Sequence, residues 1–194
     1  MPLLGILFVA VAVIGFAVGG EPPGADEGAA KVVDHYVDNK DAIQAGAAIQ
    51  AAAAALFLYF VAYLSSVLRA SAERSVLPTL ALIGAAIMAT GIAIDATISF
   101  ALSEAADDLA PAGAQALQAL WDNDFFPMAV GLQVFILSTG LAVLKYGALP
   151  KWLGWIAIVL AVIAVTPIGF AAFIGGGVWL LITSVLLTMQ ARAA

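Results

Sequence analysis

Long apolar runs alternate with short polar segments along the whole chain. Six apolar segments can be distinguished, at residues 3–19, 42–67, 77–103, 125–144, 152–168 and 170–189. Each is close to the roughly 20 residues that an α-helix needs to cross the hydrocarbon core of a bilayer. We therefore predict one all-α integral membrane domain over residues 1–194, built as a polytopic transmembrane bundle of six helices.

Two segment boundaries depend on how local signals are weighed. The last two segments form one apolar run, which we divide at Thr166-Pro167-Ile168-Gly169 because Pro and Gly together interrupt helices strongly. A break at Gly175-Gly176-Gly177 is the alternative, and it leaves a final helix too short to span comfortably. The first segment has small residues typical of a signal-peptide cleavage site at Ala17-Val18-Gly19-Gly20. No positive charge precedes it, so we predict an uncleaved helix.

Two polar connections have a helical periodicity of their own. Within residues 26–41 apolar side chains recur at helical spacing between acids, and within residues 111–127 they form one apolar side. These positions are Val32, Val33, Tyr36 and Val37 in the first connection and Leu117, Leu120 and Trp121 in the second. We predict two short amphipathic helices on the outer surface of the bundle.

Composition and the placement of charge both favour a membrane protein. The chain is 64% apolar and 10% charged, whereas a soluble domain is about 45–50% apolar and about 25% charged. Five basic residues lie on one side of the predicted spans, which the positive-inside rule makes cytoplasmic, and eleven of the thirteen acids lie on the other. The five are Arg69, Arg74, Lys145, Lys151 and Arg192. Both termini are therefore expected in the cytoplasm.

A tight turn, a basic anchor and an aromatic belt precede the fifth segment. The run Gly147-Ala148-Leu149-Pro150-Lys151-Trp152-Leu153-Gly154-Trp155-Ile156 resembles the A-L-P-K/R-W-L-G-W hairpin of uncharacterised multi-pass bacterial membrane proteins that share a domain of unknown function. Residues 30–40, before an Ala-rich span, are similar to the outer segment of the same group. The resemblance implies a bacterial plasma membrane protein. It implies no activity, because the family has none established.

Asp95 is the only charged side chain inside a predicted span, where a carboxylate is costly. Counted from the outer ends of their spans at roughly 1.5 Å per residue, Asp95, Gln50 and Gln133 lie at a similar depth of roughly 12 Å. On its own helix Asp95 belongs to a stripe of small and polar residues, which we expect to face other helices. The stripe consists of Gly84, Met88, Gly91, Asp95 and Ser99.

Two interpretations of Asp95 remain open. In the first, Asp95 forms a polar site with Gln50, Gln133 and Ser99 that opens to the outside and binds a cation or exchanges a proton. In the second, Asp95 is protonated and clamps helices together through a hydrogen bond to Gln50 or Gln133. No span contains a basic residue that would neutralise the carboxylate, which favours a protonated side chain.

The single histidine, His35, lies in the first outer segment. With Asp34 and Asp38 it forms a weak candidate metal site, because such side chains on one helical face can bind a divalent cation. Acids on a solvated helix are the simpler interpretation. We therefore predict no metal and no other cofactor.

Several function classes are excluded by the residues themselves. The chain has no cysteine for thiolate metal or iron–sulfur sites, no His or Lys within a span, and none of the common nucleotide-binding or hydrolase motifs. A net charge of −6 argues against a nucleic-acid partner. We predict a protein that is not an enzyme, a helix-packing subunit or homo-oligomer in the lipid bilayer, as the Ala-rich run 45–55 favours. The alternative is a channel or transporter that binds an ion, a proton or a small solute through Asp95.

Overall fold

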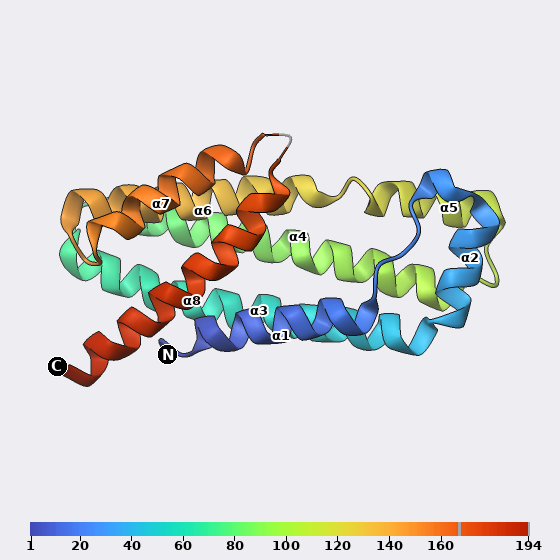
Figure 1. The fold of residues 1–194 in the computed structure, drawn as a ribbon, viewed down its shortest axis with the longest axis horizontal. Coiled ribbons are helices and arrows are strands. Elements are labelled where there is room, and N and C mark those ends of the chain that lie inside the picture. The colour runs from blue at the N-terminus through green and yellow to red at the C-terminus, as the bar shows by residue number, and fades with distance from the viewer. Residues whose placement is uncertain (167, 194) are drawn as a thin grey trace.

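The computed structural model describes residues 1–166 and 168–193. Every regular element within these residues is helical, which confirms the predicted all-α class (Figure 1). The elements are α1 (Leu4–Gly19), η1 (Ala25–Glu27), α2 (Ala29–Asp38), α3 (Lys40–Ser71), α4 (Leu77–Ala105), α5 (Pro111–Trp121), α6 (Phe125–Tyr146), α7 (Lys151–Ile163) and α8 (Phe170–Ala193). Helices α2 and α5 occupy the two connections in which short amphipathic helices were predicted.

The helices differ more in length than the sequence indicates. Four segments are long and apolar enough to cross a membrane, namely Lys40–Ser71, Leu77–Ala105, Pro111–Tyr146 and Phe170–Arg192. Helix α1 has 16 residues and α7 has 13, which correspond to about 24 Å and about 20 Å at 1.5 Å per residue. Both are shorter than the hydrocarbon core of roughly 30 Å. The segment predicted as 152–168 is therefore helical only as far as Ile163.

The boundaries of α7 follow from local sequence. Helix α6 ends at Tyr146 because Gly147 adopts a left-handed conformation (φ 77°), which only glycine takes up without strain. Pro150 then stands directly before the first residue of α7. At the other end, α7 and α8 are separated between Ile163 and Phe170. The break predicted at 166–169 falls in this interval, although Pro167 itself lies outside the described residues, and Gly175–Gly177 lie inside α8.

Helices α3, α4 and α6 run along the length of an elongated bundle (Figure 1). Helices α2 and α5 cover one end, which we call the cap end. The α3–α4 connection, the α6–α7 connection and the C-terminus lie at the opposite end, together with the five basic residues that follow or precede these connections (Figure 1). We call this the basic end. The fold therefore separates the two charge groups that the sequence had assigned to opposite sides.

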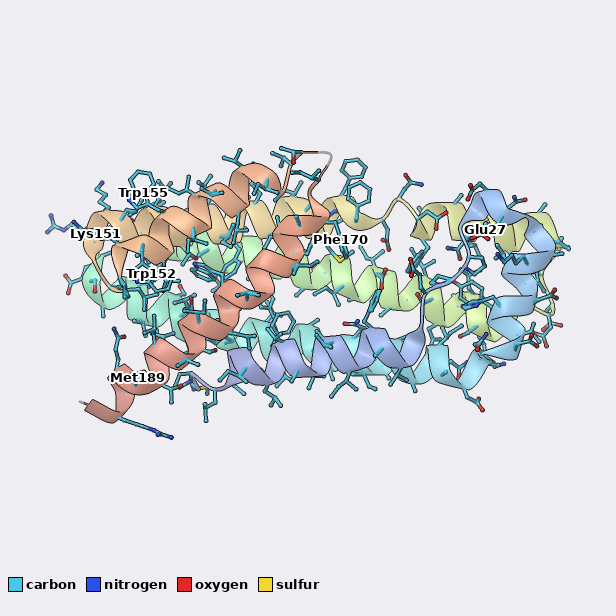
Figure 2. All side chains as sticks on the ribbon, viewed as in Figure 1. Glu27, Lys151, Trp152, Trp155, Phe170 and Met189 are labelled. Carbon is cyan, nitrogen blue, oxygen red and sulfur yellow. The ribbon has the colours of Figure 1, made fainter. Side chains whose placement is uncertain are left out.

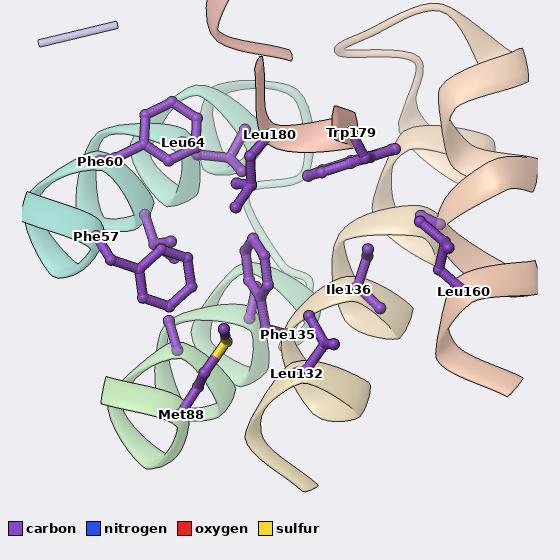
Figure 3. Packing of buried hydrophobic residues seen from close by; sticks show 14 of the residues in the cluster. Phe57, Phe60, Leu64, Met88, Leu132, Phe135, Ile136, Leu160, Trp179 and Leu180 are labelled. Atoms are coloured by element: carbon purple, nitrogen blue, oxygen red, sulfur yellow. The ribbon is translucent and has the colours of Figure 1, made fainter. Parts of the chain in front are cut away.

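Aromatic side chains join the helices at the centre of the bundle (Figure 3). The Phe57 and Phe135 rings meet edge to face with centroids 5.4 Å apart, and Phe135 meets Trp179 in the same way at 6.1 Å. The buried Trp179 Nε1 donates a hydrogen bond to the Leu153 carbonyl oxygen at 3.0 Å. Helices α3, α6, α7 and α8 are thus held by one set of contacts. A second, smaller core at the cap end packs α2, α5 and the last turns of α4 around Tyr36.

Glycines let several helices approach backbone to backbone. A Cβ atom at Gly46 of α3 would lie 2.7 Å from Gly19 Cα of α1, and a Cβ at Gly154 of α7 would lie 3.0 Å from the Gly140 carbonyl oxygen of α6. The closest contact of this kind joins α4 and α6 and is described with the site below. Such contacts are typical of helices that associate in lipid, where van der Waals packing replaces the hydrophobic effect.

Candidate functional site

The register between α4 and α6 decides what lies beside Asp95. A Cβ at Gly84 of α4 would lie 2.9 Å from Phe135 Cα of α6, and a Cβ at Gly91 would lie 2.8 Å from the Met128 backbone nitrogen. The helices are antiparallel, so moving one residue toward the C-terminus of α4 corresponds to moving one residue toward the N-terminus of α6. Asp95, four residues beyond Gly91, is therefore level with Asp124, which directly precedes α6. The predicted stripe does face a helix, as Gly84 and Gly91 show.

Asp95 is half-buried and faces two residues of the α5–α6 corner. Its carboxyl group lies near the Trp121 side chain at the end of α5 and near Asp124. Tyr36 of α2 also lies close enough for the charge of Asp95 to raise the pKa of its hydroxyl group. The polar surroundings of Asp95 thus come from α2, α5 and the start of α6.

This position corrects the depth that was predicted for Asp95. Because Asp95 is level with the first residue before α6, it lies at the outer end of that helix and above most of its length. Gln133 is level with Ala86 in the same register, about 13 Å further toward the basic end at roughly 1.5 Å per residue. The expected common depth of Asp95 and Gln133 is therefore wrong. Ser99 is half-buried on α4, one turn beyond Asp95.

Gln50 is engaged elsewhere in the bundle. Its Nε2 donates a hydrogen bond to the Ala12 carbonyl oxygen of α1 at 3.2 Å. Its side chain also packs against Gly15 of α1, where an added Cβ would lie 3.2 Å from Gln50 Cγ. Among the described residues, no hydrogen bond joins Asp95 to Gln50 or Gln133. The glutamine clamp on Asp95 is thus replaced by a contact between α3 and α1.

A hydrogen-bond chain holds the cap together next to Asp95. The buried Tyr36 hydroxyl donates to Gln118 Oε1 at 2.8 Å, and Gln118 Nε2 donates to Asp122 Oδ1 at 2.8 Å. Asp122 Oδ2 accepts a hydrogen bond from the Ala25 backbone N–H at 2.9 Å, and Gln115 Nε2 donates to the Ala25 carbonyl oxygen at 2.7 Å. Burial raises the pKa of Tyr36, and the nearby charges of Asp95 and Asp122 raise it further. Tyr36 therefore remains a neutral hydrogen-bond donor.

Two buried polar atoms beside Asp95 have no such partner. Within the described part of the chain, neither Trp121 Nε1 nor Asp124 Oδ2 forms a hydrogen bond, although both are shielded from solvent. Asp124 as a whole is 9% exposed. Buried polar atoms are normally satisfied, so unpartnered atoms on neighbouring residues mark a place where a further group is expected.

His35 lies on the other side of the cap, in a surface pocket of about 400 Å³. Its Nε2 is buried without a partner in the described structure, and burial lowers the pKa of the imidazole, which Asp38 offsets in part. Lys31 lines the same pocket and forms an ion pair with Glu27. The described residues contain no group of three His, Asp or Glu side chains placed to hold a metal ion. Asp34 and Asp38 are exposed on α2 and do not join His35 in such a group.

Sequence reasoning missed the residues that surround Asp95. Trp121 was assigned to the apolar side of the outer helix, and Asp124 and Tyr36 carried no signal that linked them to Asp95. The one available signal is position, because Asp124 directly precedes an apolar span and so has to lie at its outer end.

The fold and the site define an all-helical protein whose longest helices are compatible with a membrane. No family model matches the chain, and no curated protein or solved structure matches it.

Proposed function

We propose that this chain is an integral protein of the bacterial plasma membrane, without catalytic activity, that works as a helix-packing subunit or a homo-oligomer. The observation that carries the proposal is the outer surface of the bundle. Large apolar side chains are exposed along α1, α4, α6, α7 and α8, among them Phe170 at 74% and Trp155 at 62%. Large apolar side chains exposed along so many helices are typical of a surface that is covered by lipid or by another protein.

The basic end supports an orientation in the bilayer. Lys151 lies at this end beside Trp152 and Trp155, which project outward from α7 (Figure 2). Aromatic rings at headgroup level and basic residues on the cytoplasmic side are the usual anchors of membrane helices. Both termini lie toward the same end (Figure 1), which favours cytoplasmic termini and an even number of crossings.

A six-segment topology fits these features if the two short helices cross a locally thinned or partly covered region. Helix α7 is too short for an average bilayer, and a short apolar helix is accommodated by thinning the bilayer or by association with neighbours. Its glycine contact with α6 and the Trp179 hydrogen bond from α8 supply such neighbours. We therefore keep six segments as the proposed topology, with α2 and α5 outside.

Single-cysteine labelling tests the orientation, and the natural chain has no cysteine to remove. Asp108→Cys lies at the cap end and Glu73→Cys in the α3–α4 connection, and both positions are exposed. A membrane-impermeant maleimide applied to intact cells is expected to label the first variant at once and the second only after lysis. Labelling of Glu73→Cys in intact cells would contradict cytoplasmic basic residues.

Association is favoured by the outer face of α3. Exposed small residues recur there at three- or four-residue spacing, at Ala45, Ala48, Ala52 and Ala55, followed by exposed Tyr59. A smooth alanine face permits a second helix to approach closely. Ala52→Trp is expected to reduce the oligomer mass measured by light scattering, whereas Ala93→Trp on the exposed side of α4 is the matched control. If the two variants form oligomers of equal mass, the outer face of α3 is not the interface.

A second candidate function is the binding or passage of an ion, a proton or a small solute at Asp95. The observation that favours it is the Asp124 carboxylate beside Asp95, together with the unpartnered Trp121 Nε1. Purified protein in lipid vesicles is the test. Asp95→Asn is expected to abolish any cation or proton flux that the natural protein shows, and an unchanged flux would reject this role of Asp95.

A further inference from the structure

We propose that Asp95 and Asp124 form a proton-binding pair, which holds one proton and exchanges it with the medium at the cap end. The inference deepens the second candidate function, on which it rests, by naming the proton as the bound species. It follows from the α4–α6 register, from the charges that face the pair and from the two unpartnered atoms.

The backbone contact between α4 and α6 brings the two carboxylates together. Gly84 and Gly91 allow the two helices to touch, and the register that these contacts fix puts Asp95 and Asp124 at one level. That level holds Asp95 on α4 and Asp124 at the start of α6, and their charges interact. Two carboxylates that share a site cannot both ionise freely, because each charge disfavours the other.

No positive charge neutralises the pair within the described structure. The ion pairs of the described residues are Lys31 with Glu27 and Lys40 with Glu104, both nearer the outer surface. Helices α1 and α5 contain no charged residue, and the first charged residue of α6 is Lys145 at the basic end. The remaining titratable groups that face the pair are Tyr36 of α2 and, through Tyr36, Asp122. Tyr36 is neutral and Asp122 is negative, so neither group brings a positive charge to the pair.

The donors and acceptors at the pair favour a proton over a metal ion. Trp121, whose side chain lies near Asp95, offers only an N–H donor, which suits a carboxylate oxygen and repels a cation. One proton on Asp124 removes the repulsion between the two charges and turns its buried oxygen into a donor. A metal ion would also need ligands beyond these two, and the described residues provide no group of three.

The pair lies directly beside exposed residues of the cap end. Asp122 and Asn123 are exposed in the turn between α5 and α6, directly before Asp124. Proton exchange therefore needs no path through the bundle. The proton enters at the turn, resides on one of the two carboxyl groups and leaves by the same way.

Infrared spectroscopy of the full-length protein in lipid vesicles tests the inference, because a protonated carboxyl group has its own carbonyl band. The natural protein is expected to show this band at about pH 7, where isolated Asp side chains are ionised, and to lose it as the pH rises. Asp95→Asn and Asp124→Asn each remove one charge of the pair. The band of the remaining acid is then expected to disappear at a lower pH, because the repulsion between the two charges is gone. Asp108→Asn, an exposed acid at the same end, is the matched control and leaves the band unchanged.

Several results would overturn the inference. These are no band in the natural protein at neutral pH, a band that neither Asn variant alters, and a band that disappears on addition of sodium or calcium at constant pH. If one variant fails to fold, the other variant and the spectrum of the natural protein together test the pair. A band that behaves as expected in vesicles without proton flux rejects transport and retains the pair. Proton flux without the band retains transport and rejects the pair.

Discussion

The close contact between α4 and α6 makes the effect of one added methyl group predictable. In Gly84→Ala the new Cβ would lie 2.9 Å from the Gly131 carbonyl oxygen and 2.9 Å from Phe135 Cα, whereas ordinary contacts lie at 3.4–4 Å. The neighbouring atoms belong to the backbone and cannot rotate away. The two helices therefore have to separate, and the contacts beside Gly84 open with them.

The size of the effect follows from two opposing terms. Overpacking of a core costs about 1–3 kcal/mol, and replacement of glycine by alanine within a helix gains about 0.5–1 kcal/mol. The control is Gly177→Ala in α8, where a Cβ meets nothing within 4 Å. The helix gain is common to both variants, so the difference between them isolates the steric cost. We expect Gly84→Ala to be less stable than Gly177→Ala by about 1–3 kcal/mol.

Reversible unfolding in mixed detergent micelles, with rising dodecyl sulfate and helicity as the signal, measures this difference. The change in tryptophan fluorescence, to which buried Trp179 contributes, reports whether the core opens in the same transition. If Gly84→Ala is as stable as Gly177→Ala, the backbone contact does not exist at this distance, and the level assigned to Asp95 and Asp124 is wrong as well. The experiment thus tests the register on which the candidate site depends.

Two further predictions concern the cap. Tyr36→Phe removes the donor to Gln118 and leaves the buried Gln118 oxygen without a partner, which is expected to lower the free energy of unfolding by about 1–3 kcal/mol. Amide hydrogen exchange of α2 and α5 is expected to accelerate. Unchanged exchange would contradict the role of this bond. Burial lowers the pKa of His35 below its ordinary 6.5, so the unfolded chain binds this proton more tightly than the folded protein. Stability from neutral His35 is therefore present above about pH 6.5 and declines as the pH falls through the lowered pKa. Proton NMR of the single imidazole measures that pKa directly, and a value at or above 6.5 would refute the effect of burial. His35→Gln is expected to flatten the pH dependence.

The sequence by itself determined the helical class, the positions of most helices and the separation of charge. These properties depend on local patterns, because periodicity, Gly147 and Pro150 act on the residues next to them. The two cap helices were likewise predicted from short apolar periodicities. The end of α7 at Ile163 and the number of complete crossings did not follow from such patterns.

Only the tertiary structure decided what surrounds Asp95. Depth counted from the end of each span assumes that all spans end at one plane. Helix α4 instead continues beyond the start of α6, and its last turns pack into the smaller core of the cap around Tyr36. The register is set by glycines at which backbones touch, and such contacts join residues far apart in sequence. For this reason Asp124 and Trp121 lie beside Asp95, while Gln133 lies deeper and Gln50 binds α1.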